Sequence, residues 1–223
     1  MNFEFSPTLF DDIDQFREQA SQLGWEAEST QISSGPNQIS LDHCAFPELL
    51  VAHHHVKQAM YDVFDVPPGH VVLAICRVKL PVTYCGMVLP PSLLAILRPV
   101  RTYEVRLPAN WETYEFTISE ALIERTELFP PEYFAKTVPL EQALVPLVEP
   151  QTGQFLKRMD SYFRMFRSGK GAIARADSTA DVYDLILQGL QQLIDAGLSA
   201  GSAESPRPTR RPDLVKRARD FMI

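Results

Sequence analysis

The feature that most restricts the fold is a series of short apolar or alternating segments between residues 25 and 118, separated by turn residues. Eight such segments are present, at 38–44, 48–57, 60–66, 70–77, 82–88, 93–97, 101–107 and 111–118. Short strands at these intervals favour an antiparallel sandwich, jelly roll or barrel over a parallel nucleotide-binding sheet. In the last segment, strict alternation predicts that Tyr114 and Phe116 point inward. Glu115 and Thr117 are then expected on the outward face.

Outside this region the apolar spacing changes to that of α-helices. Residues 6–24 predict one amphipathic helix that ends at Gly24, preceded by an arm containing Phe3 and Phe5. Further helices are predicted at 119–127, 139–148, 153–168 and 178–198. The expected class is therefore α+β, with an antiparallel β domain between an N-terminal helix and a C-terminal helical region.

The helix predicted over 178–198 has the clearest pattern. Ser178 and Asp181 resemble a capping box, and leucine and isoleucine residues follow at spacings of three and four. This apolar stripe has two interpretations: it covers the outside of the sheet, or it pairs with a second copy of the chain. In the second case the dimer contacts are Leu185, Ile186, Leu190, Leu193 and Ile194.

Beyond this helix, residues 199–211 are small and polar and are interrupted by two prolines, which is typical of a linker. Pro212 then stands at a favoured first position of a final amphipathic helix, 212–223, whose apolar stripe is flanked by basic residues. A lone helix of about 12 residues is marginal in water. This segment is therefore expected to belong to a larger unit.

Three stretches of the chain resemble the AraC/XylS family of bacterial transcription regulators. They are residues 10–17 with Trp25 beyond them, residues 66–72 leading to Cys85-Gly86 and 89–91, and residues 211–219. The last stretch resembles the first helix of the family's DNA-binding domain. The resemblance rests on the order and distances of these stretches and covers most of the chain.

The resemblance implies a cupin-like effector-binding β-barrel or jelly roll and a helical dimerisation region. The implied parts are an arm and helix (1–24), the β domain (25–118), the dimerisation region (119–198), the linker (199–211) and the first helix of a helix-turn-helix domain (212–223). The implied partners are a small-molecule effector and a second copy of the chain. DNA would be contacted only through a C-terminal domain missing from this chain, which lacks recognition helices.

A β domain of this kind can enclose one small ligand in a mostly apolar pocket with a few orienting polar groups. The candidate ligand-binding residues on the predicted strands are His53, His55, Tyr61, Tyr84 and Trp111. Each of them also fits an ordinary core or surface position. A register error of one residue would exchange every inward side chain for an outward one.

The histidine cluster leaves an alternative, a cupin-type metalloenzyme that uses His53 and His55. Their spacing places both imidazoles on one face of a strand. The further ligands that such a centre needs are not at the expected positions, where Ala59 and Met60 stand. The expectation is therefore no catalytic residue, no metal and no cofactor. A third possibility is a β domain that serves as an interaction module without a small ligand.

Charge is divided unevenly along the chain, whose net value is −7. Residues 1–150 hold 9 basic and 20 acidic side chains, whereas residues 151–223 hold 12 basic and 8 acidic ones. The acidic part favours a neutral or cationic effector and gives no general attraction to nucleic acid or anionic membrane. The chain has three cysteines, its first residues do not resemble a signal peptide, and it contains no apolar run of about 20 residues. These features predict a cytoplasmic protein with free thiols and no membrane contact.

Overall fold

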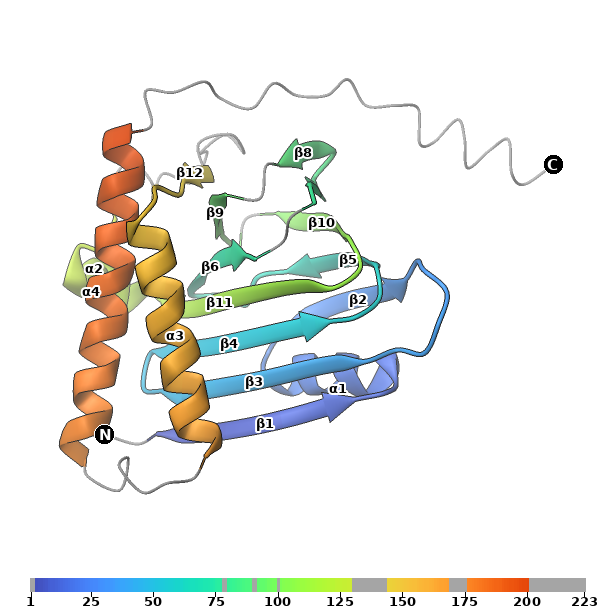
Figure 1. The fold of residues 1–223 in the computed structure, drawn as a ribbon, viewed down its shortest axis with the longest axis horizontal. Coiled ribbons are helices and arrows are strands. Elements are labelled where there is room, and N and C mark those ends of the chain that lie inside the picture. The colour runs from blue at the N-terminus through green and yellow to red at the C-terminus, as the bar shows by residue number, and fades with distance from the viewer. Residues whose placement is uncertain are drawn as a thin grey trace.

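The structure is a computed structural model that describes residues 3–77, 80–89, 92–99, 101–129, 144–168 and 176–200. Its strands form two antiparallel sheets, and two long helices lie side by side against one of them (Figure 1). The α+β class and the antiparallel β domain are as predicted.

The larger sheet has seven strands in the order β1-β3-β4-β11-β6-β9-β12. Their bounds are β1 Glu4–Phe10, β3 Ile39–Phe46, β4 Leu49–Val56, β11 Trp111–Ser119, β6 His70–Cys76, β9 Leu93–Leu97 and β12 Leu144–Pro146. The strand β11 lies at the centre, between β4 and β6. Side chains on both of its faces are shielded from water.

The smaller sheet has five strands in the order β2-β5-β10-β7-β8. Their bounds are β2 Glu26–Gln31, β5 Met60–Asp65, β10 Thr102–Leu107, β7 Val82–Tyr84 and β8 Met87–Leu89. The β7–β8 hairpin turns through Cys85 and Gly86, whose φ angles of 46° and 79° suit a tight two-residue turn. Apolar side chains of both sheets pack together in an inner core.

Helices flank the sheets in the described part of the chain, with bounds α1 Ile13–Gln22, α2 Glu120–Thr126, α3 Gln151–Arg167 and α4 Ala176–Ala200. Asp12 caps α1 by accepting a hydrogen bond from the amide of Asp14, and Ser119 caps α2 in a similar way. The helices α3 and α4 pack on the outer face of the seven-stranded sheet and form an outer core with it (Figure 1). The fold thus has three stacked layers, with the larger sheet between the layer of α3 and α4 and the smaller sheet.

Two glycines set the position of α4. A side chain at Gly189 would meet the ring of Phe155 on α3 at 2.6 Å. One at Gly197 would meet the carbonyl oxygen of Pro146 on β12 at 2.4 Å. Because both distances are far below van der Waals contact, α4 can approach α3 and β12 this closely only with glycine at these positions.

The predicted N-terminal helix over 6–24 is wrong in its first part. Residues 4–10 form β1, which pairs with β3, and the helix begins only at Ile13. The apolar residues of this segment serve the two cores: Phe10 enters the inner core, while Phe3 and Phe5 of the predicted arm pack against Phe166 of α3. Tertiary pairing has overridden a local helical pattern.

Other boundaries also differ from the predictions. The polar strand β2 has no predicted counterpart, and the segment 82–88 divides into β7 and β8. Residues 144–146 form the edge strand β12 and not the end of a helix over 139–148, whose residues 139–143 lie outside the described part. Among the described strands, the two sheets do not close into one barrel.

The C-terminal predictions are only partly covered. The helix predicted over 178–198 runs from Ala176 to Ala200, so the predicted linker begins within it. Residues 201–223, with the rest of that linker and the predicted final helix, lie outside the described residues.

Candidate functional site

A cavity of about 140 Å³ lies between the two sheets and is partly open to solvent. Its size is close to that of an engineered apolar cavity of roughly 150 Å³ that binds benzene. Strands of both sheets and one side of α1 form its walls, which are mostly apolar. Small-molecule sites in proteins commonly have this character.

Small side chains on the seven-stranded sheet create the space. Ala52, Glu115, Ala74 and Ala95 are successive cross-strand neighbours on β4, β11, β6 and β9, and all four line the cavity. Most other interior positions of these strands carry larger aliphatic or aromatic residues. A row of three alanines therefore leaves a hollow beside the Glu115 carboxylate.

The position of Glu115 corrects a prediction. Alternation along β11 predicts that Glu115 and Thr117 point outward, but both line the cavity between the sheets. Tyr114 and Phe116 are buried as predicted, in the outer core beneath the helices. The helical layer makes the difference, because it buries the face of β11 that turns away from the smaller sheet.

The five-stranded sheet contributes a second row to the cavity. Ser29, Asp62, Val105 and Tyr84 are cross-strand neighbours on β2, β5, β10 and β7. All four line the cavity, so each sheet supplies one carboxylate, Glu115 from one and Asp62 from the other. No lysine or arginine is among the described residues that line it.

His54 and Glu115 form an ion pair in the cavity wall, with His54 Nε2 at 3.2 Å from Glu115 Oε2. Burial acts to lower the pKa of His54, but the charge and hydrogen bond of Glu115 and the charge of Asp62 outweigh it, and the pKa is raised. Burial also acts to raise the pKa of Glu115, yet its pKa is lowered by His54. The pair thus favours its ionised form.

Asp62 lacks a comparable partner. Burial raises its pKa to about 6, although a hydrogen bond from the Ser29 side chain acts in the opposite direction and Glu115 adds to the rise. No described residue donates to Asp62 Oδ1. The nearby Arg17 guanidinium is engaged elsewhere, with Asp14 and with the carbonyl oxygen of Ser29.

Four polar atoms of the cavity wall are shielded from water and have no hydrogen-bond partner among the described residues. They are His54 Nδ1, Asp62 Oδ1, the Tyr84 hydroxyl and Trp111 Nε1. Nearly all buried polar groups in native proteins are paired, because an unpaired one costs about 1–3 kcal/mol. All four lie in the wall of one cavity, so partners for them have to come from outside the described residues.

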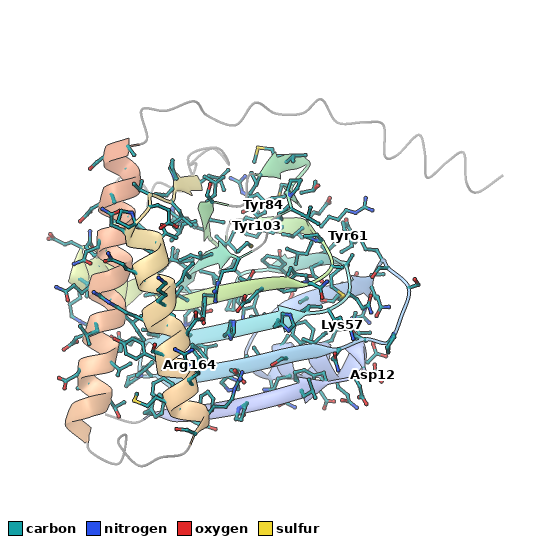
Figure 2. The ribbon with its side chains drawn as sticks, in the orientation of Figure 1. Asp12, Lys57, Tyr61, Tyr84, Tyr103 and Arg164 are labelled. Atoms are coloured by element: carbon teal, nitrogen blue, oxygen red, sulfur yellow. The ribbon has the colours of Figure 1, made fainter. Side chains whose placement is uncertain are left out.

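Aromatic rings surround these atoms. His54 stacks on Trp111 with ring centroids 6.1 Å apart and meets Phe16 edge-on at 6.1 Å. On the other sheet, Tyr84 stacks on Tyr103 at 5.8 Å, and Figure 2 shows these two side chains together. The walls therefore offer ring faces beside the unpaired polar atoms.

The helix α1 covers one side of the cavity with Phe16 and Ala20, and its C-cap residue Leu23 lines the cavity beside them. None of its residues is fully buried, and its neighbours are mainly β2 and, to a lesser extent, β1. Elements with few buried apolar contacts open at low free-energy cost. We therefore expect α1 to open at a lower free-energy cost than the strands around the cavity.

The structure brings two of the five predicted ligand-binding residues, Tyr84 and Trp111, to the cavity wall. Tyr61 is exposed and does not line the cavity. His53 and His55 lie on the opposite face of β4, outside the cavity. A ligand-binding role for any of the five stays a prediction, and the cavity supports that role for Tyr84 and Trp111.

Three polar residues of the cavity, His54, Asp62 and Glu115, are not among the predicted ones. The sequence does single out the histidine cluster that contains His54. Neighbouring residues of a strand point to opposite faces, so an error of one residue in the assumed register of β4 selects His53 and His55 in place of His54. The carboxylates give a weaker signal, since an acidic residue between apolar neighbours also fits a strand with one solvated face.

His53 takes part in a polar network that connects α3 to the sheet. His53 Nε2 donates to Glu112 Oε1 at 2.7 Å. Arg77 Nη1 bridges Glu112 Oε1 and Asp160 Oδ1 of α3, at 3.1 and 2.7 Å. The Tyr114 hydroxyl donates to the same Asp160 oxygen at 2.6 Å, and its ring stacks on His53.

The residues predicted for dimerisation are mostly covered by the chain itself. Ile186, Leu190, Leu193 and Ile194 are at most 2 % exposed and belong to the outer core. Leu185 is 42 % exposed. A second copy can therefore touch Leu185 in this structure but not the other four, and the dimer stays a prediction.

The described residues contain no group of three or more histidine, cysteine, aspartate or glutamate side chains able to hold a metal ion. The metalloenzyme alternative at His53 and His55 thus has no third ligand there. The three cysteines are free thiols, as predicted. Cys76 lines the cavity, where burial raises its pKa to about 11.

Comparison with solved structures shows what the fold resembles. The chain is similar to the crystal structure of the AraC-like transcriptional activator CuxR, with a TM-score of 0.55 and 10 % sequence identity over 98 % of this chain and 78 % of that one. At this identity the likeness shows the fold. No protein-family model and no curated protein matches the chain. No described helix is long and apolar enough to cross a membrane.

Proposed function

We propose that this chain is the effector-sensing part of a transcriptional regulator of the AraC type, which binds a small molecule between its two sheets. The observation that carries the proposal is the set of four unpaired polar atoms in one apolar cavity. The fold shared with an AraC-like activator supports the regulatory role. The ligand would change the affinity for DNA of a helix-turn-helix domain that follows the linker.

Two strands offer a route from the ligand to the helices. On β4, His54 faces the cavity and the adjacent His53 faces the network at α3. On β11, Glu115 faces the cavity and Tyr114 hydrogen-bonds Asp160 of α3. A ligand that binds two arrangements of these strands with different affinity would shift the position of α3 and of α4 packed beside it.

In this proposal the dimer and the DNA contact lie toward the C-terminal end. The exposed side of α4, including Leu185, is the surface available to a second copy. The basic residues of segment 212–219 would belong to the first helix of the DNA-binding domain. Residues 1–223 alone should not retard a promoter fragment specifically, and specific retardation at about nanomolar concentration would contradict this assignment.

The ligand-binding part is tested by a thermal-shift screen of metabolites against residues 1–223. A ligand at a hundredfold excess over its dissociation constant adds about 2.7 kcal/mol to the free energy of unfolding. In the variant Ala74→Phe a ring occupies the cavity, so the shift should disappear. Val88→Phe places the same ring on an exposed position of β8 outside the cavity and should keep the shift.

Two outcomes would contradict the ligand-binding proposal. One is a screen without any ligand that stabilises the protein. The other is a ligand whose shift is the same in Ala74→Phe and in the wild type, which would place it outside the cavity. Overpacking the cavity costs about 1–3 kcal/mol in the free energy of unfolding, so Ala74→Phe has to be checked for folding. A cooperative unfolding transition shows that the variant is folded.

A further inference from the structure

We infer that the cavity binds a small organic cation, an amine or amidine on a compact ring that also carries an acceptor oxygen. This inference rests on the proposed effector-binding function and specifies the chemistry of the ligand. It follows from the charges that line the cavity, from its unpaired atoms and from its aromatic walls.

The charged groups of the wall leave one negative charge without a partner. His54 pairs with Glu115 at 3.2 Å, whereas Asp62 has an unpaired oxygen that is shielded from water. An isolated charge in an apolar interior is costly unless an opposite charge compensates it. An ammonium group of the ligand supplies that charge, while a carboxylate would add a third acid to the same cavity.

Arg17 acts on Asp62 through its charge, which acts to lower the pKa of the carboxyl, but it does not donate to the unpaired Oδ1 atom. Arg17 is not among the residues that line the cavity. Its Nη1 donates to Asp14 at 2.9 Å, and its other terminal nitrogen donates to the carbonyl oxygen of Ser29. The Asp62 Oδ1 atom therefore remains available to a cation that enters the cavity.

The remaining unpaired atoms of the cavity wall indicate that the ligand also carries a hydrogen-bond acceptor. Trp111 Nε1 is a donor in every protonation state, and His54 Nδ1 is a donor when the ring is protonated. Both need an acceptor, which an oxygen on the ligand provides. The Tyr84 hydroxyl can donate or accept and does not distinguish between ligands.

The aromatic walls also favour a cation. The rings of Phe16, Phe64 and Trp111 line the cavity together with that of Tyr84. A cation within about 6 Å of an aromatic face is attracted by the ring, most strongly when it is desolvated. The same faces hold a compact ring of the ligand by stacking, in a volume close to that of a benzene site.

Three probes of one shape test the inference by titration calorimetry at about pH 8. They are 3-hydroxybenzylamine, 3-hydroxybenzyl alcohol and 3-hydroxybenzoate, which differ in charge and share a ring and a phenol oxygen. We expect the amine to bind at least about tenfold more tightly than the alcohol, and the acid to bind most weakly.

Variants locate the effect. Asp62→Asn should weaken binding of the amine at least about tenfold and leave the alcohol within about twofold, because only the charge is removed. Asp65→Asn is the matched control, since Asp65 lies on the same strand, is exposed and does not line the cavity. It should change neither probe.

Equal or tighter binding of the alcohol or the acid would overturn the inference, as would amine binding that is unchanged in Asp62→Asn or not detectable at all. The metabolite screen separates this failure from that of the proposed function. If the screen finds a neutral or anionic ligand whose binding is abolished by Ala74→Phe, the proposed effector-binding function stands and the inference of a cationic ligand is overturned. A cationic ligand excluded by Ala74→Phe and weakened by Asp62→Asn would support both.

Discussion

Replacing Asp62 by asparagine should stabilise the unliganded protein by an amount that depends on pH. The carboxylate lies in an apolar cavity with one oxygen unpaired, and burial raises its pKa from 3.8 to about 6. A carboxyl group with a higher pKa in the folded state binds its proton more tightly there than in the unfolded state. The free energy of unfolding therefore falls as the pH rises from about 4 to about 6.

The magnitude follows from the two pKa values. They differ by about 2, from 3.8 to about 6, and a difference of one in pKa corresponds to about 1.36 kcal/mol. Charging Asp62 therefore costs the folded state about 3 kcal/mol above pH 6 and almost nothing below pH 4. For a domain of this length, one kcal/mol moves Tm by about 2–4 °C, so Asp62→Asn should raise Tm by roughly 6–12 °C at about pH 8.

Thermal and urea unfolding of the wild type, Asp62→Asn and the exposed control Asp65→Asn at about pH 4, 6 and 8 provide the measurement. The gain of Asp62→Asn over the wild type should grow along this series, and Asp65→Asn should stay within about 0.5 kcal/mol of the wild type. A gain that is the same at every pH, or a loss at about pH 8, would refute the view that burial with one unpaired oxygen makes the Asp62 carboxylate costly.

Four further variants test the packing of the helices and the exposed side of α4. Tyr114→Phe removes the 2.6 Å hydrogen bond to Asp160 and should cost about 1.5–3 kcal/mol in urea unfolding, and a cost near zero would contradict the role of this network. Gly189→Ala should cost about 1–3 kcal/mol because α3 must move. Gly153→Ala, which meets only the flexible end of a glutamate, should be neutral or stabilising by up to about 1 kcal/mol, and equal effects of the two changes would count against a close helix contact. Leu185→Glu should halve the molar mass in light scattering if the exposed side of α4 is the dimer contact; a dimer that survives the change would place the contact elsewhere.

The strands of the β domain are largely predictable because turn residues separate them and each is long enough to show its apolar positions. The segment at 93–97 agrees with β9, and the segment at 111–118 agrees with β11 to within one residue. The strands β1 and β2 are not predictable in the same way. Residues 4–10 have apolar positions that also fit a helix, and β2 is a polar strand held by its pairing with β5.

The cavity is harder to predict than the strands that enclose it. Tyr84 and Trp111 are recognisable as aromatic residues on strands, but the choice between His53 and His54 depends on which face of β4 meets the smaller sheet. Alternation does not decide this, because α3 and α4 bury the other face as well. Glu115 is likewise predicted to face solvent, because the alternation along β11 does not show that the helices bury the face that carries Tyr114 and Phe116.

The row of Ala52, Ala74 and Ala95 has a consequence for how such a site changes over generations. Each alanine lies on a different strand and contributes only a methyl group to the cavity floor. A mutation to valine or leucine at any one of them alters the shape of the hollow and leaves the backbone pairing and the acidic groups in place. A single substitution at one of these alanines would therefore change the space open to a ligand, while the fold and the contacts of β4 and β11 with α3 stay the same.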